Sequence, residues 1–103
     1  MKEIAQAILS TKLKDSARWF EDEHYAALQH HVFRDGIWDV NFRDKIGRIR
    51  EKPVHALSAD EINTYLTFIF CTDRTQEGCV EVHIANGVLP ALMKRTLELE
   101  ECQ

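Results

Sequence analysis

Ser58-Ala-Asp-Glu-Ile-Asn-Thr-Tyr-Leu-Thr-Phe-Ile-Phe-Cys-Thr-Asp-Arg-Thr-Gln-Glu-Gly78 is the stretch that decides the fold. Its first four residues fit a capping box, in which the Ser58 hydroxyl accepts the Glu61 amide proton and the Glu61 carboxylate accepts the Ser58 amide proton. The apolar residues behind this box share a helical stripe with Asp73, and the second half of the stretch is apolar nearly all round. We therefore predict a buried central helix from Ser58 to about Asp73.

The same region has a second interpretation as a β-hairpin across residues 65–84. Residues 65–72 are rich in strand-forming side chains, and residues 80–84 alternate between apolar and polar. The helix is favoured because the capping box runs into the apolar pattern without a break. We therefore expect an all-α fold, a compact bundle of five or six helices around the central one, with an α+β fold as the alternative.

Shorter patterns on both sides predict the other helices. Apolar residues at near-helical spacing indicate a first helix over 2–13, and Asp15-Ser16 can cap a second one, with a break near the adjacent acids at 21–23. A third helix is expected over about 41–51, ended by Pro53, then a short helix over 79–85 and a last helix with Pro90 in its first turn. We expect the central helix to pack against the second and the last.

Composition limits the class of protein. The chain has 103 residues, of which 45% are hydrophobic and 29% charged, as is typical of a single globular domain over residues 1–103. Its formal net charge of −4 has the wrong sign for a bulk nucleic-acid binder. The chain has no apolar run of membrane-spanning length and begins without the apolar region of a signal peptide. We therefore expect no membrane association and a cytoplasmic protein with reduced cysteines.

Several short motifs carry a resemblance to a known family. They are Leu66-Thr67, Asp73-Arg74, Glu77-Gly78, Gly87-Val-Leu and Leu92-Met-Lys-Arg95, with Gly36-Ile-Trp38 upstream. Over roughly residues 33–99 this pattern resembles a bacterial family known only as a domain of unknown function (six-five-zero-eight). The sequence departs from the family at Cys71, where members tend to have arginine, and at Thr75, where they tend to have phenylalanine. The resemblance implies a helical fold and a shared polar cluster, and it implies no chemistry.

The charged residues that follow the central helix form the main candidate site. Asp73, Arg74 and Glu77 place a guanidinium close to carboxylates, which suits a polar ligand or a partner's anchor and equally suits a structural turn. We combine them with Trp38 into one candidate interaction surface, because exposed aromatic residues mark partner sites. The predicted function is a non-enzymatic protein-interaction or regulatory module with an unknown protein partner. A homodimer is one way to cover exposed aromatic side chains.

A basic run supports an alternative function. Its members are Arg43, Lys45, Arg48, Arg50 and Lys52. A basic helix face with aromatic residues nearby suits contacts to phosphates, so nucleic-acid binding through this run is the alternative. The same pattern also fits a solvated helix face whose long stems cover apolar side chains.

Metal binding and catalysis form a third class. Only Cys79 and His83 have the spacing of a metal half-site, and Cys71 is the residue that the fold would have to bring to them. The sequence contains no nucleophile elbow, glycine-rich phosphate loop or zincin-type helix. We therefore assign no catalytic residue, metal or cofactor, and keep a small enzyme or metal-binding protein as the second alternative.

Overall fold

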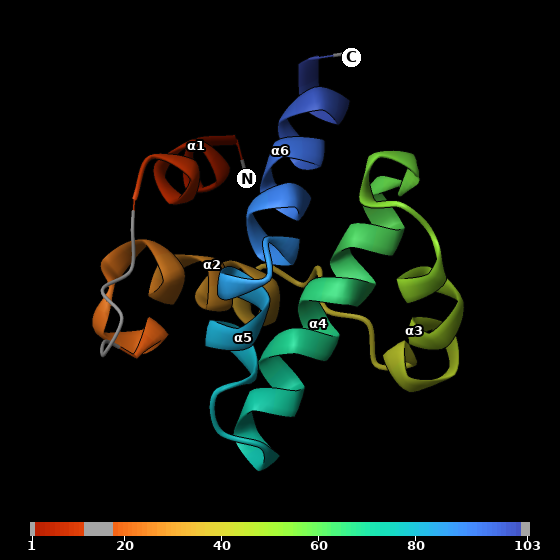
Figure 1. Cartoon of the computed structure of the whole chain (residues 1–103), viewed down its shortest axis with the longest axis horizontal. Coiled ribbons are helices and arrows are strands. Elements are labelled where there is room, and N and C mark those ends of the chain that lie inside the picture. Colours follow the sequence, from red (N-terminus) through yellow and green to blue (C-terminus); the bar gives the residue numbers. More distant parts are fainter. Residues whose placement is uncertain (1, 12–17, 102–103) are drawn as a thin grey trace.

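The computed structural model describes residues 2–11 and 18–101, and the account below concerns these residues. Within them the regular elements are all helical and no strand occurs, so the all-α prediction is confirmed and the hairpin alternative over 65–84 was wrong. The elements, shown in Figure 1, are α1 (Lys2–Ser10), η1 (Trp19–Glu21), α2 (Glu23–Arg34), α3 (Phe42–Glu51), η2 (Val54–Ala56), α4 (Ala59–Thr75), α5 (Cys79–Ala85) and α6 (Val88–Glu101). None of these helices combines the length and apolar character needed to cross a membrane.

α4 is the central helix, and it starts where the capping box predicted. The Ser58 hydroxyl accepts the Glu61 amide proton at 3.2 Å, and the Glu61 carboxylate accepts the Ser58 amide proton at 3.0 Å. Side chains are buried on several sides of the helix because neighbours surround it. These side chains belong to Ile62, Thr64, Tyr65, Leu66, Thr67, Ile69 and Phe70.

The neighbours of α4 differ in part from the predicted ones. The helix packs most extensively against α3 and α5, and less extensively against α2 and α6. The predicted contacts with the second and last helices are therefore present, but the main ones come from helices joined to α4 by short connections, as is usual for consecutive elements. α1 packs against α6 and α2 on the other side of the molecule (Figure 1).

Caps explain where the shorter helices begin and end. The Asp22 carboxylate accepts the amide protons of His24 and Tyr25, so the acidic run at 21–23 starts α2 and separates it from η1. The first helix was predicted to reach residue 13 and ends at Ser10. Residues 12–17, with the predicted Asp15-Ser16 cap, lie outside the described residues. α5 spans the predicted residues 79–85, and Pro90 lies in the first turn of α6.

Candidate binding groove

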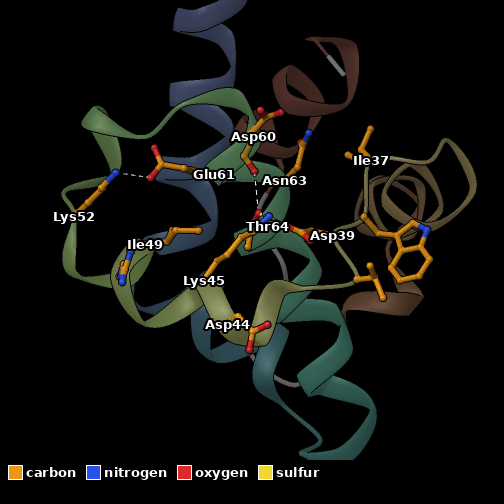
Figure 2. A pocket seen from close by; sticks show the side chains of 13 residues that line it. Ile37, Asp39, Asp44, Lys45, Ile49, Lys52, Asp60, Glu61, Asn63 and Thr64 are labelled. Atoms are coloured by element: carbon orange, nitrogen blue, oxygen red, sulfur yellow. Dashed lines mark hydrogen bonds and ion pairs between the residues drawn. The ribbon is translucent and has the colours of Figure 1, made fainter.

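An open groove of about 680 Å³ runs between residues 37–40, α3 and the first half of α4 (Figure 2). Residues 37–40 have no regular secondary structure and connect α2 to α3. The volume falls within the range of about 300–1,000 Å³ that is typical of ligand sites, although such sites usually have more apolar walls. We call this feature the groove, and its walls carry both apolar and charged side chains.

Asp39 holds residues 37–40, which connect α2 to α3, against α4 at the floor of the groove. Its amide proton is donated to the Thr67 hydroxyl oxygen at 3.0 Å, and that hydroxyl donates in turn to the backbone oxygen of Asn63 at 2.8 Å. The Asp39 carboxylate accepts from the Thr64 hydroxyl at 2.8 Å and from the Lys45 ammonium at 2.9 Å. One aspartate therefore links the connection to both α3 and α4, as Figure 2 shows for Asp39, Lys45 and Thr64.

These bonds keep the pKa of the Asp39 carboxyl below its ordinary value. The largest cause is the hydrogen bond from Lys45, followed by those from the Thr64 hydroxyl and the Asn41 amide. Each of these donors stabilises the charged carboxylate relative to the neutral acid. Asp39 is therefore ionised at neutral pH and keeps its acceptor role at the groove floor.

A second ion pair lies at the other end of the groove. The Lys52 ammonium is 2.5 Å from the Glu61 carboxylate, which also accepts the Ser58 amide proton of the capping box. The pKa of Glu61 is lowered first by Lys52 and then by the Ser58 amide. This pair joins the end of α3 to the start of α4 (Figure 2).

Three further charged side chains line the groove without such partners. Asp44, Arg48 and Asp60 make no ion pair within the part of the chain that the structure describes. Asp44 stands in the first turn of α3 and Asp60 in the first turn of α4, where the helix dipole favours a negative charge. These groups are exposed to solvent and free to meet a ligand.

Two exposed apolar side chains also line the groove. Trp38 is 46% exposed and Val40 is 69% exposed. Exposed tryptophan is enriched where proteins meet their partners, because it buries a large area with little loss of conformational freedom. Trp38 therefore lines the groove, whereas Asp73, Arg74 and Glu77, with which it was grouped in the prediction, do not.

The predicted polar cluster after α4 is assembled around a different arginine. The Arg18 guanidinium donates to the Glu77 carboxylate and, at 2.5 Å, to the Glu81 carboxylate, and it lies 3.8 Å from Asp73. The Trp19 indole donates to Asp73 at 2.8 Å. The hydrogen bonds that Arg18 donates to Glu81 and Glu77 raise the pKa of its guanidinium. We call this group, Arg18, Trp19, Asp73, Glu77 and Glu81, the Arg18 clasp.

Asp73 also shapes the turn between α4 and α5. Its second carboxylate oxygen accepts the amide protons of Gly78 and Val80, each at 3.2 Å. Gly78 has a φ of 98°, a left-handed conformation that favours glycine. Arg74 points elsewhere, with its guanidinium 4.9 Å from the centre of the Phe33 ring. The structure thus places Asp73 and Glu77 together and Arg74 apart from them.

The basic run of α3 is divided between two faces of the helix. Successive residues turn by about 100°, so Lys45, Arg48 and Lys52 share the groove face while Arg43 and Arg50 lie on the opposite side. The latter two guanidiniums lie over phenylalanine rings, 5.5 Å and 5.4 Å from the ring centres. The five predicted nucleic-acid contacts therefore do not form one continuous basic strip.

Cys79 and His83, the candidate metal half-site, contact each other within α5. The Nδ1 atom of His83 lies 2.8 Å from the backbone oxygen of Cys79, which has no proton, so the ring nitrogen must donate to it. That nitrogen is then unable to accept a proton from the Cys79 thiol, 3.7 Å away. Burial raises the pKa of the Cys71 and Cys79 thiols. Among residues 2–11 and 18–101 no group of three or more His, Cys, Asp or Glu side chains is placed to hold a metal ion.

Comparison with known proteins adds no identity. No family model, curated protein or solved structure matches this chain. The resemblance to the bacterial family of unknown function (six-five-zero-eight) therefore stays a prediction. Asp39 and Arg18 were not predicted as site residues because their partners lie on other elements. Asp60 was not predicted because only the folded chain brings it to the groove.

Proposed function

We propose that this protein is a non-enzymatic protein-interaction module that binds a peptide segment of its partner in the groove. The observation that supports the proposal is an open groove with a hydrogen-bonded floor and two exposed apolar side chains, Trp38 and Val40, along its edge. Because Asp39 connects the floor to α3 and α4, little ordering is needed when a partner arrives. A binding surface that is already formed keeps more of its contact energy as affinity.

The chemistry of the groove favours binding over catalysis. Its Asp39 and Glu61 carboxyls have lowered pKa values, so they exchange protons poorly near neutral pH. Both also serve as fixed acceptors for the floor and for the start of α4. These groups stabilise the shape of the groove and leave the neighbouring exposed charges to contact a partner.

Selection from random peptides displayed on phage tests this proposal. Selected peptides should bind the wild-type protein and lose about tenfold or more in affinity to Asn63→Arg, whose long side chain would fill the groove. The control is Val82→Arg, which adds the same charge at an exposed position on α5 and should leave affinity unchanged. If no peptide is enriched, or both variants bind equally well, the groove is not a peptide-binding site.

The alternative, nucleic-acid binding through α3, has weaker support. Two of its five cations, Lys45 and Lys52, are already paired with carboxylates, and the others lie on different faces of the helix. A labelled single-stranded oligonucleotide should therefore give no shift in a low-salt gel. A salt-sensitive shift that is lost when Arg48 and Arg50 are both changed to Glu would replace the peptide-binding proposal.

A further inference from the structure

We infer that the occupant of the groove is a basic segment with an apolar anchor, a statement about partner chemistry that rests on the proposed function. The groove has four carboxylates and three basic groups among its lining residues. Asp39 and Glu61 are neutralised by Lys45 and Lys52 within the protein. The charges that remain for a partner are two carboxylates and one guanidinium.

The two available carboxylates stand on different walls of the groove. Figure 2 shows Asp60 above and Asp44 below the contact between Asp39 and Thr64 at the floor. A chain lying over this floor passes between a carboxylate of α3 and a carboxylate of α4. Lysine or arginine side chains can meet such flanking carboxylates from one backbone, whereas acidic side chains would be repelled by both.

The apolar part of the lining adds a second requirement. Ile37 is half-buried and Ile49 almost fully buried, and both line the groove with Trp38. An aliphatic side chain can cover the exposed part of Ile37, and a cationic side chain can also lie over the half-exposed Trp38 ring, which attracts cations through its π-electrons. This protein already makes such a contact where Arg74 lies over Phe33.

The charge of the whole chain agrees with this choice. The formal net charge is −4, so a basic segment is attracted to the molecule before it reaches the groove. The competing charge is Arg48, the lining cation that makes no ion pair among the described residues and would favour an acidic residue of the partner. One guanidinium against two carboxylates leaves the available charge of the groove negative, and a basic segment is therefore the better match.

Tryptophan fluorescence gives a direct test, because the chain has two tryptophans. In a Trp19→Phe background Trp38 alone reports on the groove. Three capped hexapeptides alternate leucine with lysine, with glutamate or with glutamine. The lysine peptide should give a saturable change in Trp38 fluorescence, with a Kd about tenfold lower than that of the glutamate peptide. Changing both Asp44 and Asp60 to Asn should raise this Kd about fivefold, as expected for two exposed ion pairs.

A charge-matched control separates the groove from general attraction. Glu3→Gln combined with Glu21→Gln removes the same charge at exposed positions that do not line the groove, and should change the Kd less than about twofold. Melting curves by circular dichroism confirm that each variant is folded. An equal effect of the two double variants, a lack of saturation, or equal or tighter binding of the glutamate peptide would overturn the inference.

The outcomes also distinguish this inference from the proposed function. If displayed peptides bind in a groove-dependent way but are acidic or neutral, the groove remains a peptide site and the inference about charge is wrong. If sedimentation velocity shows a dimer that Trp38→Ala abolishes, the occupant is a second copy of the chain and the inference is again overturned. A failure of phage selection ends the proposed function itself.

Discussion

The two ends of α4 carry similar charged groups and use them in different ways. At the C-terminal end, the Arg18 clasp joins three carboxylates to one guanidinium and an indole. Both oxygens of Asp73 are engaged there, and its side chain is only 9% exposed. At the N-terminal end, the groove contains two internal ion pairs and three further charges that meet no partner within the described residues.

This difference shows why density of charge alone does not mark a site. In the Arg18 clasp the arginine, the indole and two backbone amides contact the carboxylates, so the group fastens η1 to the turn between α4 and α5. Only the second oxygen of Glu81 is buried there without a hydrogen-bond partner among the described residues. In the groove, the internal pairs hold the floor while Asp44, Arg48 and Asp60 stay open to solvent. A candidate site therefore needs both space and charges that the fold has not already satisfied.

The largest effect is expected from Asp73→Ala in the Arg18 clasp. The change leaves two backbone amides and the Trp19 indole without their acceptor, and should lower the free energy of unfolding by about 3 kcal/mol. Asp44→Ala in the groove is the control, and should cost about 0.5 kcal/mol because its carboxylate makes no ion pair in residues 2–11 and 18–101. Urea denaturation measures both. If both variants lose the same free energy of unfolding, the two ends of α4 do not differ in how their charges are used.

A smaller effect is expected from Asp39→Ala at the groove floor. It removes two hydrogen bonds and an ion pair, but the Lys45 side chain is largely exposed and regains water, so the loss should be about 2 kcal/mol. The variant should also lose affinity for groove-binding peptides, because the connection at residues 37–40 loses its link to Thr64. A destabilised variant with unchanged peptide affinity would show that the floor does not shape the groove.

The stabilisation that depends on the charge of Asp39 should vanish in acid. The pKa of this carboxyl is lower in the folded protein than the value of about 3.9 expected for the unfolded chain. The charge therefore stabilises the fold at pH values above 3.9, and this contribution is lost as the pH falls through the folded pKa. The stability difference between wild type and Asp39→Asn, measured by urea denaturation, should be constant from about pH 5 to 7 and shrink below about pH 4. A stability difference that stays constant down to pH 3 would show that the charge of the Asp39 carboxylate does not stabilise the fold.

The helical fold was predictable because its strongest signals are local. A capping box, an apolar run and a proline are each read from residues within a turn or two of one another. They located α4, α5 and the start of α6. The helices that surround α4 were less predictable, since an apolar helix face does not state which neighbour covers it.

The sites were less predictable because their partners are distant in sequence. Asp73 and Arg74 were grouped as neighbours, yet adjacent residues on a helix point about 100° apart and do not face each other. Arg18 meets Asp73 only in the folded chain, as Asp39 meets Thr64. The division of the basic run between two faces of α3 follows from the same rotation, and helical geometry applied to the sequence would have shown it.

The smallest effect is expected from Gly47→Ala, which tests whether the groove is formed as firmly as the Arg18 clasp. Gly47 lies inside α3 with an ordinary helical φ, and an added Cβ would meet no atom within 4 Å. Alanine should raise the free energy of unfolding by about 0.5–1 kcal/mol, because it favours the helix and restricts the unfolded chain. Gly36→Ala, at a φ of 79°, should instead lower the free energy of unfolding.

The Gly47→Ala variant also tests the order of the groove wall. If α3 is already ordered before a partner binds, Gly47→Ala leaves peptide affinity unchanged. A gain in affinity that parallels the gain in stability would mean that this wall orders on binding, and the groove would then be a mobile surface in contrast to the fastened end of α4.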